Sequence, residues 1–212
     1  RLHAVAIEGG PGGGFGTGDH RIHYTVSADG GRSFARPITV SRSDETLPYF
    51  FANPSIAVDT RRRWLYIAYV RGGRDARWDL VIAASRNGGQ TWSRTRIGDD
   101  PACAIHMVPN LALDPTTGKL HLAWYDSRGP EARFAHAVCG PGATRCTQLG
   151  RINDIPFAAL STTRDGARSI GDHQALVVDD KRRTLHAVWT QPVAGPDGTI
   201  TSRIFHARTK LR

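Results

Sequence analysis

Two short apolar runs joined by a polar turn decide the fold of this chain: NLALD at residues 110–114 and LHLAWY at residues 120–125. The same unit recurs as SIAVD (55–59) with LYIAYV (65–70), and as ALVVD (175–179) with LHAVWT (185–190). In every copy, the leucine that opens the second run stands six residues after the aspartate that closes the first. Apolar runs separated by turn residues are typical of β-hairpins, and the constant gap predicts three of them.

A third strand is expected after each hairpin, at residues 80–85, 133–137 and 203–207. A fourth copy of the repeat opens the chain with LHAVAI (2–7), followed by a strand at 22–27. The opening leucines lie at 2, 65, 120 and 185, so they are 63, 55 and 65 residues apart. Antiparallel units repeated at such a period are typical of a β-propeller. We therefore predict an all-β propeller, whereas the alternative, a β-sandwich, leaves the repeat unexplained.

Four blades are expected, at about residues 1–48, 49–101, 102–154 and 155–212. The chain would open inside one blade and stop inside another. We interpret it as the C-terminal part of a six- or seven-bladed ring, with a complete four-bladed ring as the alternative.

Composition excludes several other classes of protein. The 212 residues are 40% hydrophobic and 22% charged, which is ordinary for a globular domain and untypical of a disordered or fibrous chain. Three glutamates and one methionine against 23 glycines and 12 prolines disfavour a helical bundle. No apolar stretch approaches the roughly 20 residues that cross a bilayer. The chain opens with an arginine and lacks a leader pattern, so we expect any targeting segment to lie outside it.

The net charge of +9 fits binding to polyanions. However, 25 of the 28 basic residues are arginines spread along the chain, a bias that a GC-rich genome produces without any partner. A solvated basic surface is the simpler interpretation, and an electrostatic binder of polyanions remains an alternative.

Two segments after third strands share a finer pattern, SADGGRSF at 27–34 and SRNGGQTW at 85–92. An Asp or Asn side chain can accept backbone N–H groups inside such a turn, glycines supply positive φ, and the final aromatic ring can pack on the blade. The pattern resembles the Asp-box, or BNR, repeat of the sialidase-like propellers, S-x-D-x-G-x-T-W. The residues that carry it are Ser27, Asp29, Gly31 and Phe34, and Ser85, Asn87, Gly89 and Trp92. The resemblance implies a fold and a structural turn, because the box recurs in propellers of many functions.

The third blade has AVCGPGATRC at 137–146 where the box belongs. We predict a disulfide between Cys139 and Cys146 that clamps this turn, which implies an oxidising compartment such as the periplasm or the cell exterior. Three reduced thiols are the alternative. Cys103 would be free, and Cys103 with His106 does not make a zinc site.

In propellers of this family, ligands bind on the face that carries the loops between second and third strands and the starts of the innermost strands. Ionisable residues of this chain converge there, and our candidate ligand-binding residues are Arg71, His106, Arg128, Asp172 and His173. Asp19, His20 and Arg74 are also expected on this face. The glycine-rich run at 9–18 lacks the ending of a phosphate-binding loop, so we interpret it as a flexible loop.

Sialidases resemble this chain in the expected fold, and they use a tyrosine nucleophile beside a glutamate, an aspartate acid/base and three arginines that grip the substrate carboxylate. Tyr125, Asp126 and Glu131 are the residues of suitable type for catalysis, next to Arg128. Their spacing matches no catalytic motif of the family, and the arginine triad cannot be assigned. Asp126 and Arg128 resemble the W-x-D-x-R element common in BNR proteins, where an ion pair that stabilises the loop is the simpler role.

The leading hypothesis is a secreted or surface-exposed propeller that recognises glycans or proteins, or serves as a scaffold. A sialidase-like glycoside hydrolase acting on acidic sugars is the second, and a polyanion binder the third. The sequence gives no sign of a nucleotide cofactor, a haem, a complete metal site or a specific nucleic-acid partner.

Overall fold

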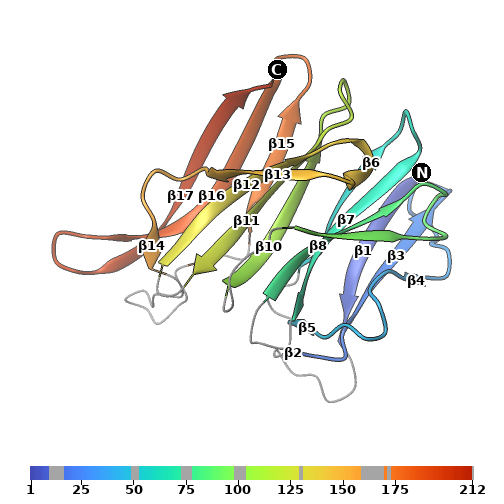
Figure 1. The fold of residues 1–212 in the computed structure, drawn as a ribbon, viewed down its shortest axis with the longest axis horizontal. Coiled ribbons are helices and arrows are strands. Elements are labelled where there is room, and N and C mark those ends of the chain that lie inside the picture. Colours follow the sequence, from blue (N-terminus) through green and yellow to red (C-terminus); the bar gives the residue numbers. More distant parts are fainter. Residues whose placement is uncertain are drawn as a thin grey trace.

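The computed structural model describes residues 1–9, 17–48, 53–72, 78–97, 104–128, 131–158, 170 and 173–211, with only the backbone of residues 17 and 128. The described chain is built almost entirely of antiparallel β-strands (Figure 1). Its one short helical turn is the 3-10 segment η1 (Pro141–Ala143). The prediction of an all-β protein is therefore confirmed.

The strands form four groups that follow one another along the chain. The first group holds β1 (Leu2–Glu8), β3 (Arg21–Ser27) and β4 (Ile38–Thr39), beside a short pair of β2 (Thr17–Gly18) and β5 (Leu47–Pro48). The second holds β6 (Ser55–Asp59), β7 (Trp64–Gly72), β8 (Trp78–Ser85) and β9 (Ser93–Ile97). The third holds β10 (Ala104–Leu113), β11 (Leu120–Arg128), β12 (Glu131–Cys139), β13 (Cys146–Arg151) and β14 (Phe157–Ala158). The last holds β15 (Ala175–Asp179), β16 (Thr184–Ala194) and β17 (Ile200–Lys210).

The three predicted hairpins are present, as β6–β7, β10–β11 and β15–β16. The second and third groups are not separate sheets, however, because one parallel bridge between Ile105 and Trp78 joins β10 to β8. These two groups therefore form one nine-stranded sheet, and the described strands do not close into a ring. Figure 1 shows the groups side by side in sequence order, from blue to red.

The apolar runs are continuous because the central strands are buried on both sides. Alternate residues of a strand point to opposite faces of a sheet. On β7, Tyr66, Ala68 and Val70 belong to the core shared with the third group, whereas Ile67 and Tyr69 belong to the core shared with the first. A strand that is covered on both faces needs apolar residues at every position. Each group thus supplies the cover for its neighbour.

The turn after β3 is held by its own side chains. Ser27 Oγ accepts the Gly31 N–H at 2.8 Å, and Asp29 Oδ1 accepts the Ser33 N–H at 3.0 Å. The Ser33 hydroxyl donates to Asp29 Oδ2 at 2.6 Å. These hydrogen bonds to the ionised form hold the pKa of Asp29 well below its usual range, with the Ser33 hydroxyl as the largest cause. The polar side chains of this turn are therefore engaged in hydrogen bonds that stabilise the turn itself.

The turn after β8 repeats this arrangement with Asn87 in place of the aspartate: Ser85 Oγ accepts the Gly89 N–H at 2.9 Å and Asn87 Oδ1 accepts a backbone N–H at 2.9 Å. The closing rings differ between the turns. Trp92 packs on the core, edge-on to Tyr24 of the first group at 5.5 Å, whereas Phe34 is 48% exposed. Phe34 is therefore less covered than Trp92, and its packing on the blade stays a prediction.

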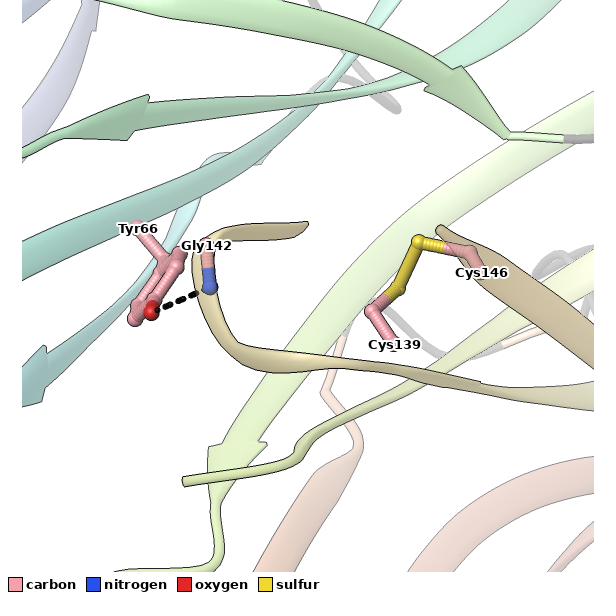
Figure 2. The surroundings of a disulfide bond; sticks show 4 residues. All are labelled: Tyr66, Cys139, Gly142 and Cys146. Atoms are coloured by element: carbon pink, nitrogen blue, oxygen red, sulfur yellow. Dashed lines mark hydrogen bonds between the residues drawn. A yellow bond between two sulfur atoms is a disulfide. The ribbon is translucent and has the colours of Figure 1, made fainter. Parts of the chain in front are cut away.

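The predicted disulfide between Cys139 and Cys146 is confirmed, and it joins register partners of β12 and β13 (Figure 2). The turn that it closes reaches across to the second group, where the Tyr66 hydroxyl accepts the Gly142 N–H at 3.1 Å (Figure 2). The disulfide therefore braces a turn that also fastens two groups together.

At the same end of the sheets, an ion pair fastens the third group to the last. Arg183 donates through Nη1 and Nη2 to the two carboxylate oxygens of Asp114, at 2.6 and 2.8 Å. Asp114 is buried, and these hydrogen bonds are the main reason why its pKa lies well below the usual range. The neighbouring pair of Arg182 with Asp179, at 3.0 Å, is far more exposed.

Candidate functional site

Most of the predicted ligand-binding residues belong to one end of the sheets, opposite the hairpin turns. We call it the loop end; of the described residues it comprises 8–9, 18–21, 71–72, 78–79, 104–106, 126–128 and 131–133, toward the lower edge of the sheets in Figure 1. Arg74, Asp172 and Cys103, like most of the glycine-rich run, lie outside the described residues, as does the side chain of Arg128.

A hollow of about 220 Å³ opens beside the loop end of β11, β12 and β13. Buried Trp124 and Asp126 lie within it, and the exposed residues Arg133 and Gln148 stand around it. Its other lining residues are Ala135, His136, Gly150 and Arg151. The register explains the grouping, because Asp126 is the cross-strand partner of Arg133 and both point to the same face. One carboxylate, one amide and two guanidinium groups therefore surround a small hollow.

His106 supports this hollow from β10. Trp124 Nε1 donates to His106 Nδ1 at 2.9 Å, and Asp126 Oδ1 lies 3.5 Å from the same nitrogen. An indole N–H can only donate, so Nδ1 is the acceptor and the proton of a neutral His106 resides on Nε2. Trp124 is thereby held in place beside Asp126. His106, predicted as a ligand-binding residue, is 1% exposed and acts here as a positioning residue.

The structure does not bring Tyr125, Asp126 and Glu131 together. Tyr125 and Asp126 are adjacent on β11, so their side chains leave opposite faces of the strand. The Tyr125 hydroxyl donates to the Thr190 carbonyl at 2.7 Å and accepts the Thr190 N–H at 3.0 Å, which ties β11 to β16. A nucleophile needs an accessible oxygen, and this one is engaged by the backbone. A catalytic role for Tyr125 stays a prediction that these contacts disfavour.

Glu131 and His173 are both exposed, and neither lines the hollow. Glu131 opens β12 as the register partner of Arg128, and it is also paired with Ala158 of β14. His173 stands just before β15. Their roles in ligand binding or catalysis stay predictions.

Arg71 belongs to a cluster of charges that the sequence analysis missed. Its Nη2 donates to Asp79 Oδ2 at 3.1 Å, and its Nη1 lies 3.9 Å from Glu45 Oε1. Glu45 and Asp79 are both 5% exposed. The Tyr69 hydroxyl also donates to Glu45, at 2.9 Å. The positive charge of Arg71 is thus balanced within the protein, which makes this residue a poor anchor for an anionic ligand.

Tyr69 of that cluster has a carboxylate beside it, as a tyrosine nucleophile would, but its surroundings do not favour ionisation. Burial is the largest cause that raises the pKa of Tyr69 far above its usual range, and the negative charge of Glu45 adds to it. Both effects keep the phenol protonated. Tyr69 and Glu45 therefore form a buried hydrogen bond that fixes the loop before β5.

Within the described parts of the chain, no three His, Cys, Asp or Glu side chains come together as a metal-binding group. In the same residues, no helix has the length and apolar character needed to span a bilayer.

No protein-family model and no curated protein sequence matches the chain. Solved structures do match it. The Hadza microbial sialidase Hz136 superposes with a TM-score of 0.59 at 11% identity, over 89% of this chain and 38% of its own. An N-acetylgalactosamine deacetylase from F. plautii, in complex with blood group B trisaccharide, gives 0.54 at 14% identity, over 94% and 66%. The NanB sialidase from Streptococcus pneumoniae gives 0.53 at 13% identity, over 91% and 29%.

At these identities the likeness shows the fold: the chain has a sialidase-like, antiparallel all-β architecture. It spans at most 66% of the length of these three proteins.

Proposed function

We propose that the chain is part of a β-propeller whose loop end recognises a glycan, with blades at about residues 1–48, 49–101, 102–154 and 155–212. Two observations support the propeller. The four groups of strands follow one another side by side, and the central groups bury both of their faces. The two turns after third strands also share the hydrogen bonds expected of an Asp-box. Blades that shield one another in sequence order are the arrangement of a propeller.

The hollow beside Trp124 carries the proposal of glycan recognition. Sugar hydroxyls both donate and accept hydrogen bonds, and the hollow offers an acceptor in Asp126 and donors in Arg133, Arg151 and the Gln148 amide. Its volume of about 220 Å³ lies below the usual range for drug-sized ligands, which suits a single sugar unit at the end of a glycan. The fold is shared with two sialidases and with a deacetylase crystallised with a trisaccharide.

A glycan array with the purified chain tests this function, followed by calorimetry with the best ligand. We expect Asp126→Asn and Arg133→Gln each to weaken binding by roughly tenfold, because each removes a charge-assisted hydrogen bond. Arg145→Gln is the matched control, since Arg145 is exposed in the disulfide-closed turn at the other end of the same group. Equal losses in Arg133→Gln and Arg145→Gln would contradict a site at the hollow.

Hydrolysis of acidic sugars is the alternative function, and the shared fold is the observation that keeps it open. A fluorogenic sialoside tests it directly. A rate that disappears in Tyr125→Phe would establish an enzyme, although the contacts of Tyr125 with Thr190 predict no such rate.

Nonspecific binding of polyanions is the other alternative, and it predicts affinity that falls steeply with salt without sugar selectivity. The ion pairs of Arg62, Arg182 and Arg183 with neighbouring aspartates reduce the free positive charge at the hairpin turns.

We also propose that the protein acts outside the cytoplasm, at the cell surface, in the periplasm or as a secreted module. The disulfide between Cys139 and Cys146 supports this location, because disulfides persist in oxidising compartments. Free-thiol labelling of Cys139 and Cys146 in protein isolated from its native host tests it, and full labelling would argue for a reducing compartment.

A further inference from the structure

A second and larger cavity, of about 450 Å³, lies between the third group of strands and the last. It shares His136 and Arg151 with the lining of the hollow beside Trp124, and its other lining residues differ. Its walls come from β11, β12 and β13 on one side and from β16 and β17 on the other. This volume is within the range of small-molecule sites in proteins.

The cavity exists because two small residues face it. Ala187 and Ala207 are register partners on β16 and β17. Two residues away on the same face, Trp189 and Phe205 are also partners, and their rings stack at 5.8 Å. The rings of Trp189 and Phe205 fill the space between the groups, whereas the methyl groups of Ala187 and Ala207 leave it open. The remaining apolar lining is Val138, Leu149, Ile152, Leu185 and Leu211.

A buried histidine leaves one hydrogen-bonding atom without a partner in this cavity. His121 is 6% exposed, and its Nδ1 lies 3.2 Å from His136 Nε2, with the two rings stacked. His121 Nε2 is buried and has no hydrogen-bond partner among the described residues. A buried polar atom without a partner costs free energy that a bound group can restore. His121 therefore brings a ring nitrogen without a partner to a lining that is otherwise largely apolar on the strand faces.

The exposed lining residues give the cavity mouth a positive charge. They include Lys119, Arg151, Arg208 and Lys210, whereas the only acidic lining residue, Asp114, is already paired with Arg183. An anionic group at the mouth would thus meet several cations.

We propose that this cavity binds a small amphipathic organic anion. Its apolar, ring-sized body would lie on Ala187 and Ala207, a hydroxyl or amide at its inner end would pair with His121 Nε2, and its carboxylate or sulfonate would face the arginines and lysines of the mouth. Although His136 and Arg151 line both sites, the residues changed in the tests of the two proposals differ, so the two proposals can fail independently.

The probe that fits this description is 6-hydroxynaphthalene-2-sulfonate, which carries a hydroxyl and a sulfonate at opposite ends of an aromatic body. We expect saturable one-to-one binding in calorimetry. In a long-range proton–nitrogen NMR spectrum of histidine-labelled protein, the Nε2 resonance of His121 should shift, with its assignment taken from His121→Gln. Naphthalene-2-sulfonate, which lacks the hydroxyl, should bind roughly tenfold more weakly. The cationic analogue 6-(aminomethyl)-2-naphthol should not bind.

Two variants test the location. Ala207→Phe fills the cavity and should abolish binding, with its fold checked by circular dichroism and thermal unfolding. Lys119→Gln should weaken binding roughly three- to tenfold, whereas Lys181→Gln, which removes the same charge from the exposed hairpin turn of the last group outside the cavity, should leave it unchanged. Equal binding of the cationic analogue, an unmoved His121 Nε2 resonance, equal effects of the two lysine variants, or no binding at millimolar probe would each overturn the proposal.

Discussion

The contact between Tyr24 and Gly89 gives the sharpest test of how neighbouring groups of strands are joined. Gly89 has φ +92°, and a Cβ placed on it would lie 2.9 Å from Tyr24 Cδ1 and closer still to Cε1. Displacing the Tyr24 ring would cost free energy, because Tyr24 is 2% exposed and packs on Trp92, and its hydroxyl is hydrogen-bonded to His3 Nδ1 at 2.8 Å. Gly89→Ala therefore combines backbone strain with a steric clash inside the core.

Gly88 in the same turn separates the two effects. It has φ +73°, but a Cβ there would meet no atom within 4 Å. Gly88→Ala should cost only the backbone strain, about 1–2 kcal/mol. Gly89→Ala adds overpacking, which is worth about 1–3 kcal/mol more. In a chain of this size the difference corresponds to a melting temperature about 3–9 °C lower.

Urea and thermal unfolding of the two alanine variants, followed by circular dichroism, measure this difference. In a Tyr24→Ala background, the further loss of stability caused by Gly89→Ala should be close to that of Gly88→Ala, because the clashing ring is gone. If Gly89→Ala were no less stable than Gly88→Ala, the Tyr24 contact would not join the first and second groups as described, and the reasoning would fail.

Three further predictions concern stability. In urea, Arg183→Gln should lower the unfolding midpoint clearly, since it strands a buried carboxylate, whereas Arg182→Gln should barely change it because that ion pair is exposed. Joint replacement of Cys139 and Cys146 by alanine should cost about 2–3 kcal/mol from the short loop that they close, seen as a lower midpoint that reductant no longer shifts. Burial lowers the pKa of His136 to about 4. The unfolded chain therefore takes up more protons, and stability should be full above about pH 6.5 and decline toward pH 4. His136→Gln should flatten that decline in a pH series of urea titrations, and an unchanged slope would contradict it.

Much of the fold could be predicted from the sequence because the central strands are buried on both faces. The run at 65–70 is apolar at every position, the run at 120–125 is apolar except for His121, and the turns between paired strands have a constant length. The bridge between Ile105 and Trp78 could not be predicted, because a single contact between two groups leaves no periodic pattern. The high exposure of Phe34 could not be predicted either, because its turn has the same sequence pattern as the turn of Trp92, whose ring packs on the core.

The candidate site was less predictable for a different reason. Strand alternation places Tyr125 and Asp126 on opposite faces, so their adjacency in sequence was a signal against a shared site. The partnership of Arg71 with Asp79 also follows from the hairpin register, in which the two residues are directly opposed. Glu45, by contrast, comes from a loop that precedes β5, and no local pattern brings it to Tyr69. This contact depends on the packing of a distant loop, which only the three-dimensional structure shows.

The contacts between Tyr24 and Gly89, Arg62 and Gly118, and Arg86 and Gly142 share one direction: a side chain always reaches forward to a glycine of a group made later. During synthesis on the ribosome, the reaching side chain therefore exists before the glycine that receives it. Each newly emerged group can dock on a template already in place, as expected of modules that contact mainly their neighbours. Assembly of this chain should accordingly proceed in the order of translation, from the amino end toward the carboxyl end.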